Sequence, residues 1–74
     1  MEVVKIHTEY INLGQFLKLK GFIANGGEAK IAVLDMEIKV NSVVETRRGR
    51  KLYPGDTIKI KKRSFLIQKD VYKG

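Results

Sequence analysis

The side chains best suited to chemistry in this 74-residue chain form the basic segment Arg47-Arg48-Gly49-Arg50-Lys51, which we call the basic loop. A planar guanidinium can donate two hydrogen bonds to one phosphate and can stack on a base. Gly49 would allow a ligand to approach the backbone closely. Lysines and acids provide solubility equally well, so the three arginines favour contact with a polyanion.

One stretch of the sequence carries the net charge, which is formally +7. The stretch from Arg47 to Arg63 holds eight basic residues and one acid, Asp56, while the rest of the chain has seven residues of each sign. Such a confined excess is the usual electrostatic sign of a nucleic-acid partner. Lysines on strands also guard sheets against association, so the sequence leaves two roles open for Lys59, Lys61, Lys62 and Arg63.

Residue types that would support other chemistry are scarce. His7 is the only histidine and the chain has no cysteine, so no metal site or acid-base pair can be built around them. We therefore predict a non-enzymatic protein without a metal, a cofactor or a small-molecule substrate. The missing cysteines suit a reducing compartment, the apolar runs are too short to cross a bilayer, and the first residues lack the order of a signal peptide. These features predict a cytoplasmic protein with no membrane partner.

The first half of the chain predicts a strand and a helix within a single domain over residues 1–74. Alternating β-branched residues predict a strand at residues 3–8. Asn12 and Gln15 have the spacing of a capping box, which predicts that a helix begins there and ends near Gly21. Its apolar stripe would consist of Leu13, Phe16 and Leu17.

The second half predicts another helix and four short strands. Asn25 and Glu28 repeat the capping-box spacing ahead of a helical period that continues to Met36. The alternation beyond it predicts a tight hairpin over 38–44 with Asn41 at its turn, and two strands at 57–61 and 64–67 joined by a turn at Lys62 and Arg63. The fold class is therefore α+β, with two short helices packed on one face of a small, mostly antiparallel sheet.

In this order and spacing the residues resemble the S-four RNA-binding domain, also called the αL domain, a family named for a small-subunit ribosomal protein. The resemblance covers about residues 11–62. It rests on Ala29 early in the second helix and on the segments 38–41 (Ile-Lys-Val-Asn) and 52–58 (Leu-Tyr-Pro-Gly-Asp-Thr-Ile). The segments 13–18, 26–30 and 47–52 are similar to the short standalone bacterial branch of this family, the YaaA and YbcJ type.

This resemblance implies a monomeric binding module for structured RNA, above all ribosomal RNA, that acts in ribosome assembly or ribosome-associated quality control. The basic loop would supply most contacts, and the match to the bacterial branch adds the lysines of the two helices. Asn41 is favoured as a turn former, and Tyr53 is the aromatic residue that adjoins the basic loop and could stack on a base. The predicted RNA-binding residues are Arg47, Arg48, Arg50, Lys51, Lys30, Lys18, Gln15, Asn41 and Tyr53.

Two other kinds of protein remain as alternatives. A β-grasp sulfur carrier is also small and also closes with a glycine-aspartate-x-isoleucine strand, but it acts through a terminal diglycine, whereas this sequence ends in Tyr72-Lys73-Gly74. The early helix pair also does not suit a fold that opens with a hairpin. The second alternative is a small adapter that binds an acidic protein partner.

Overall fold

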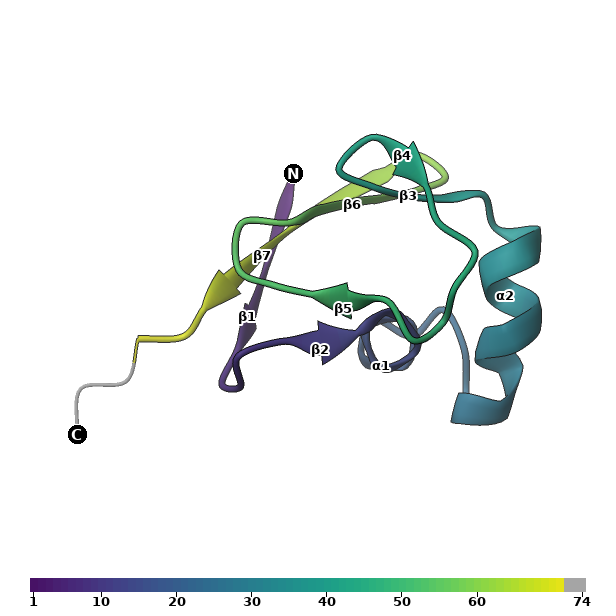
Figure 1. The fold of residues 1–74 in the computed structure, drawn as a ribbon, viewed down its shortest axis with the longest axis horizontal. Coiled ribbons are helices and arrows are strands. Elements are labelled where there is room, and N and C mark those ends of the chain that lie inside the picture. Colours follow the sequence, from purple (N-terminus) through teal and green to yellow (C-terminus); the bar gives the residue numbers. More distant parts are fainter. Residues whose placement is uncertain (72–74) are drawn as a thin grey trace.

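The computed structural model describes residues 1–71 and shows two helices packed against a five-stranded sheet (Figure 1). Every neighbouring pair in this sheet is antiparallel except β1 and β7, which run parallel with Glu2 opposite Phe65. The predicted α+β class is thus confirmed. In spatial order the strands are β1 (Glu2–Ile6), β7 (Arg63–Lys69), β6 (Thr57–Ile60), β3 (Ile38–Val40) and β4 (Val43–Val44).

A second, two-stranded ladder lies outside this sheet and was not predicted from the sequence. It pairs β2 (Ile11–Asn12) with β5 (Lys51–Leu52) in antiparallel register. Each of these strands has two residues, too few for an alternating pattern to reveal. The ladder joins the start of the first helix to the end of the basic loop.

Several strand boundaries also differ from the prediction, since the strands expected at 3–8, 57–61 and 64–67 are Glu2–Ile6, Thr57–Ile60 and Arg63–Lys69. β1 ends at Ile6 and not at Thr8. The turn between β6 and β7 lies at Lys61 and Lys62, because Arg63 already pairs with Ile60 across the two strands. Lys61 takes the positive φ of 56° that this tight turn requires.

The first helix, α1 (Leu13–Leu19), begins and ends as its sequence predicts. The Asn12 side chain accepts from the Gln15 amide at 2.8 Å, and the Gln15 side chain accepts from the Asn12 amide at 3.0 Å, which completes the capping box. At the other end Gly21 has φ +78°, and the amides of Gly21 and Phe22 donate to carbonyls of the last turn. This Schellman arrangement explains why the helix stops there.

The second helix, α2 (Ala29–Asp35), starts later than predicted and without the expected capping box. A 3₁₀ turn, η1 (Gly26–Glu28), precedes it, and α2 has no side-chain cap. The Asn25 side chain accepts from the amide of Gly27, two residues on, at 3.1 Å, and so does not reach the amide of Glu28. The two consecutive glycines permit this tighter turn, which moves the α-helical start to Ala29.

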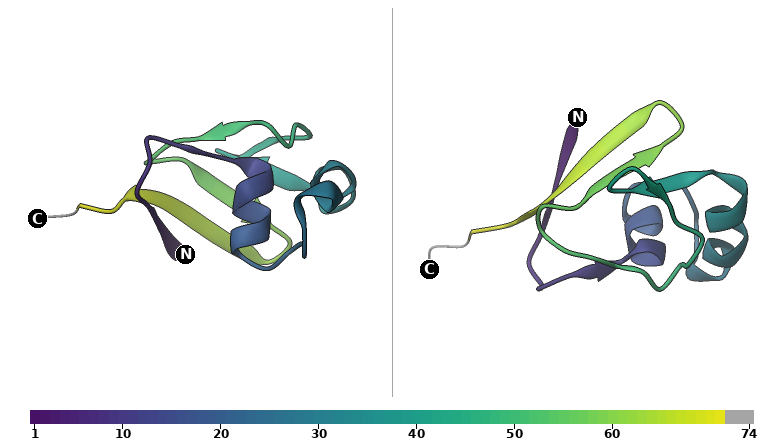
Figure 2. Two further views of the ribbon diagram at one scale, coloured as in Figure 1. Left: turned by 90° about the horizontal axis from the view of Figure 1, so that it is seen from below. Right: turned by 45° about the horizontal axis from the view of Figure 1, so that its top comes forward.

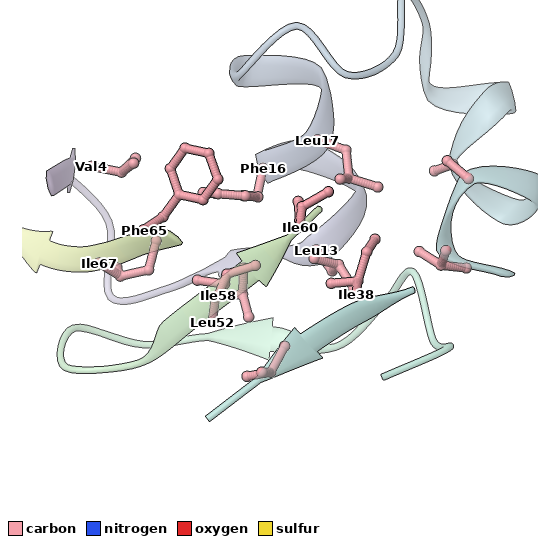
Figure 3. Packing of buried hydrophobic residues seen from close by; sticks show 14 of the residues in the cluster. Val4, Leu13, Phe16, Leu17, Ile38, Leu52, Ile58, Ile60, Phe65 and Ile67 are labelled. Carbon is pink, nitrogen blue, oxygen red and sulfur yellow. The ribbon is translucent and has the colours of Figure 1, made fainter. Parts of the chain in front are cut away.

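The core lies between the sheet and α1, and Leu52 of β5 closes it from the side of the ladder (Figure 3). Figure 2 shows α1 across one face of the sheet, with α2 beside it at the end where β3 begins. Phe16 meets Phe65 edge to face, with ring centroids 5.1 Å apart. The predicted stripe of α1 is confirmed, since its three residues are completely buried: Leu13, Phe16 and Leu17.

No helix within residues 1–71 is both long and apolar enough to cross a bilayer. The longest helices have seven residues each.

The two leucines at the end of α1 provide a matched test of this packing. Leu17 is completely buried, whereas the Leu19 residue is 61% exposed. Replacing Leu17 by alanine should therefore reduce the free energy of unfolding by about 2–5 kcal/mol, because it leaves a cavity, while Leu19→Ala should change it by no more than about 0.5 kcal/mol. Urea melts followed by circular dichroism measure both values. Equal losses in the two variants would show that the buried face of α1 is assigned wrongly.

Candidate functional site

The basic loop crosses the start of α1 and is attached there by its backbone. The Leu13 amide donates to the Arg50 carbonyl at 2.8 Å, and the Gly14 amide donates to the Arg48 carbonyl at 2.9 Å. A Cβ on Gly14 would lie 3.3 Å from the Cβ of Ala29 in α2 and 3.5 Å from the Arg48 carbonyl oxygen. Glycine therefore allows the first helix, the second helix and the loop to meet at one point.

A buried carboxylate, that of Glu45, organises the basic loop from inside. Glu45 follows β4 and is only 6% exposed. One of its oxygens accepts from the amides of Thr46 and Arg47 and from Nε of Arg47, each at 3.0 Å. The other accepts from Nη2 of Arg47 at 3.1 Å and from Nη1 of Arg50 at 2.8 Å. All five donors belong to the segment that follows Glu45.

These donors keep Glu45 ionised. The hydrogen bond from the Arg47 side chain is the main influence that lowers its pKa, from 4.5 to about 2, against the opposing effect of burial. Hydrogen bonds from the Arg50 side chain and from the Arg47 amide act in the same direction. Glu45 was not predicted from the sequence as part of the site, although an acid two residues before a cluster of arginines is a signal for ion pairing.

Arg48 differs from the other two arginines of the basic loop because its side chain forms no ion pair with a carboxylate of residues 1–71, and it is exposed. It lies between two open depressions and lines both. Lys30, Thr46 and Arg47 line the first depression, together with apolar residues of α2. The second lies over the start of α1, and its lining includes Asn12, Gly14, Gln15, Lys18, Gly26, Ala29 and Gly49.

The fold thus brings together five of the predicted RNA-binding residues, which come from three separate segments. We call them the Arg48 surface: Gln15, Lys18, Lys30, Arg47 and Arg48. Arg50 belongs to the same loop, but it is half-buried and points one guanidinium nitrogen at Glu45.

Lys51 and Tyr53 lie beyond the Arg48 surface in an aromatic cluster. The rings of Tyr10 and Tyr53 have centroids 5.6 Å apart, and Nζ of Lys51 lies 4.8 Å from the centroid of the Tyr10 ring. A further depression lined by Tyr10 adjoins the Arg48 surface, because Asn12 and Gln15 line both. The sequence predicted that Tyr53 adjoins the basic loop, but Tyr10 also lies beside the Arg48 surface, because the β2–β5 ladder places it next to Tyr53.

Asn41 lies apart from the Arg48 surface, in the turn between β3 and β4. Its φ of 51° and the φ of 70° at Ser42 are those of the tight hairpin predicted there. The side chain of Asn41 donates to Asp56 at 3.0 Å and accepts from the amide of Thr57 at 2.9 Å. It therefore holds two turns together, which agrees with the interpretation as a turn former.

The sequence suggested that the charged stretch from Arg47 to Arg63 forms a single patch. In the structure it does not. Arg63 pairs with Glu2 at 2.9 Å and lies 5.0 Å from the centroid of the Phe65 ring, at the far edge of the core. Lys20 also pairs with Glu2, and these two cations lower the pKa of that carboxyl. Lys59 lies on β6, in the interior of the sheet. Strands separate residues that are close in sequence, so the stretch divides into distinct regions.

The helix pair, the sheet and the loop that crosses the start of α1 together define an αL domain. The chain belongs to the S4 domain family, whose model matches residues 4–68.

Three comparisons give its particular relatives. The "Probable ribosome maturation protein RlbA" of Bacillus subtilis (strain 168) is 51% identical over 57 residues, which cover 77% of this chain and 80% of that protein. YbcJ of Escherichia coli (strain K12) is 39% identical over 49 residues, which cover 66% and 70% of the two chains. The solution structure of YbcJ, described as revealing an αL motif involved in RNA binding, matches with a TM-score of 0.66 and 30% identity over 92% of this chain and 87% of that one.

Replacing Glu45 tests whether its carboxylate holds the loop. Glu45→Gln keeps the shape but removes the charge, so it should reduce the free energy of unfolding at pH 7 by about 1–3 kcal/mol. Since folding lowers the pKa of Glu45 from 4.5 to about 2, its contribution is present above pH 4.5 and is lost as the pH falls toward 2. The difference in stability between the two proteins should therefore shrink over that range.

Urea titrations at pH 7, 4 and 2.5 measure this difference, and Glu28→Gln is the matched control. Glu28 is exposed in η1, so its replacement should have little effect at any of the three pH values. A stability difference for Glu45→Gln that is independent of pH would contradict the assignment of its charge.

Proposed function

We propose that this chain is a monomeric, non-enzymatic RNA-binding protein of the cytoplasm, built as a single domain, and that it binds structured ribosomal RNA during ribosome maturation. The observation that carries the proposal is the convergence of Lys18, Lys30, Arg47 and Arg48 from two helices and one loop around two adjoining depressions. Such a convergence on a rigid frame suits the phosphate backbone of a folded RNA, which is recognised chiefly by its shape.

Within this surface the residues have different proposed tasks. Arg48 projects from a fixed backbone, and its guanidinium would donate to phosphate oxygens in a two-pronged contact. Lys18 and Lys30 would add point charges on either side, from α1 and α2. Arg47 is 72% exposed at its side chain despite its bonds to Glu45, so its outer edge also remains open to a phosphate.

The aromatic cluster extends the proposed surface toward an unpaired part of the RNA. Tyr10 is 38% exposed and Tyr53 is 47% exposed, so a base could stack on either ring. Lys51 would contact the backbone beside such a base. Asn41 is the predicted contact with least support, because the protein itself occupies both ends of its side-chain amide.

The relatives support the ribosomal setting. One is named "Probable ribosome maturation protein" and another carries an αL motif described as involved in RNA binding. Crosslinking the protein in cells and sequencing the attached RNA tests the setting directly. We expect ribosomal RNA to dominate the recovered fragments, and a library without that enrichment would contradict the ribosomal part of the proposal while leaving RNA binding intact.

The two alternative functions have less support. Membership of the S4 domain family counts against a β-grasp sulfur carrier. Gly74, on which carrier chemistry would depend, lies outside the described residues. An adapter for an acidic protein would keep its partner after nuclease treatment, whereas an RNA-binding protein would lose its partner.

The salt dependence of binding tests the electrostatic basis of the proposal. About four to six phosphate contacts should give a slope of log K against log salt of roughly −3 to −5. Fluorescence anisotropy with a labelled ribosomal RNA hairpin, repeated at several potassium chloride concentrations, measures this slope. A flat response would exclude binding through the basic residues.

Arg48 is the most informative single position for mutagenesis, because its side chain forms no ion pair with Glu45. Arg48→Ala should weaken RNA binding and make the salt slope shallower by about one unit, with little change in the melting temperature. Arg48→Lys keeps the charge but loses the planar fork, and it should bind with intermediate affinity.

The control for Arg48 is Lys62→Ala, which removes one exposed charge from the turn between β6 and β7. If this control weakened binding as much as Arg48→Ala, the protein would act through a diffuse positive field and not through a defined surface.

A further inference from the structure

The face of the sheet opposite the helices carries a second group of basic side chains. Both α1 and the buried core lie on one face (Figure 2). Alternation along β6 and β3 turns Ile58, Ile60, Ile38 and Val40 toward the core, which turns Lys59 and Lys39 to the other, open face. The strand register places Lys39 directly opposite Lys59, and Lys59 directly opposite Ser64.

This arrangement carries an electrostatic cost. Like charges directly opposite one another on neighbouring strands disfavour the sheet. Neither Lys39 nor Lys59 forms an ion pair with a carboxylate within residues 1–71. The common structural reason for strand lysines is protection of a sheet edge, but β3 and β6 are both interior strands. The lysine pair therefore lacks the structural role that the sequence had left open for Lys59.

The surroundings of the pair suit a phosphate. A shallow depression on the open face is lined by both lysines and by the hydroxyl-bearing residues Ser42, Thr57 and Ser64, with no carboxylate in its lining. Hydroxyls and ammonium groups are common partners of nucleic-acid phosphates. A neighbouring depression shares both lysines and adds Lys61, but Asp35 and Glu37 line it too, so the hydroxyl-lined depression is the better anion site.

We propose that Lys39 and Lys59, with the hydroxyls around them, form a second binding site for the RNA backbone on the open face of the sheet. The site faces away from the helices that build the Arg48 surface, so one straight RNA helix could not occupy both. The domain would then hold two RNA segments at once, one on each side, and we call this arrangement a clamp. This inference rests on the proposed RNA binding at the Arg48 surface and adds a second segment to it.

Nuclear magnetic resonance of the whole 74-residue chain tests the proposal, because amide resonances report each surface separately. The nitrogen-15 labelled protein is titrated with a short ribosomal RNA hairpin. We expect the amides of Arg48 and Gly49 to shift first and those of Lys39, Thr57 and Lys59 to shift in a later phase, as a second hairpin binds. In Lys39→Gln/Lys59→Gln the later phase should be lost and the first retained.

Lys5→Gln/Lys69→Gln is the matched control, because it removes the same charge from exposed lysines of β1 and β7. This control should keep both phases. The Lys39→Gln/Lys59→Gln variant should also melt no lower than the parent protein, since the repulsion between the lysines is gone, so misfolding would not account for its lost phase.

Several outcomes would overturn the clamp. Open-face amides that do not move with RNA, or that move equally in Lys39→Gln/Lys59→Gln, would exclude the second site. Open-face shifts with polyglutamate but not with RNA would assign that face to an acidic protein. If the open face responded to RNA while Arg48 and Gly49 did not, the proposed function of the Arg48 surface would fail and the clamp would fail with it, a pattern distinct from loss of the second site alone.

Discussion

The ion cluster of Glu45 is the interaction on which the proposed binding surface depends. A buried carboxylate is costly unless hydrogen bonds satisfy it, and here four of the five donors come from the basic loop and the fifth is the amide of Thr46, just before it. The loop must therefore fold around Glu45, which sets where its arginines point. An acidic residue thereby orders part of a cationic loop, and its ion pairs offset part of the charge of Arg47 and Arg50. The backbone of Arg48 is held separately, by the hydrogen bond from the Gly14 amide to its carbonyl.

Backbone contacts transmit this order to the rest of the fold. The carbonyls of Arg48 and Arg50 accept from the first amides of α1, so the loop and the helix hold one relative position. The same bonds occupy amides of the helix start, which leaves the exposed side chains and not the helix dipole to attract an anion. The close approach at Gly14 then brings α2 to the other side of Arg48.

Local signals in the sequence predicted most of the local structure, although the capping box expected at Asn25 and Glu28 did not form. Asn12 and Gln15 predicted the start of α1, and Asn41 predicted the hairpin, because both depend on contacts between near neighbours. The prediction failed where residues distant in sequence meet. Tyr10 contacts Tyr53 because the β2–β5 ladder places the two rings side by side. Arg63 belongs to the basic stretch in the sequence, but in the fold it pairs with Glu2. Glu45 was missed because its role depends on burial, which the charge pattern alone does not reveal.

The parallel pairing of β1 with β7 has a consequence for the way this chain folds. Glu2 lies opposite Phe65, so the first strand of the sheet pairs with the strand that the ribosome synthesises last. During synthesis the helices and the β3–β4 hairpin can form from contacts close in sequence, whereas β1 must wait as an unpaired edge. Closure of this long loop should therefore be a late and slow event, and the nascent domain exposes its hydrogen-bonding edge until the final strand emerges.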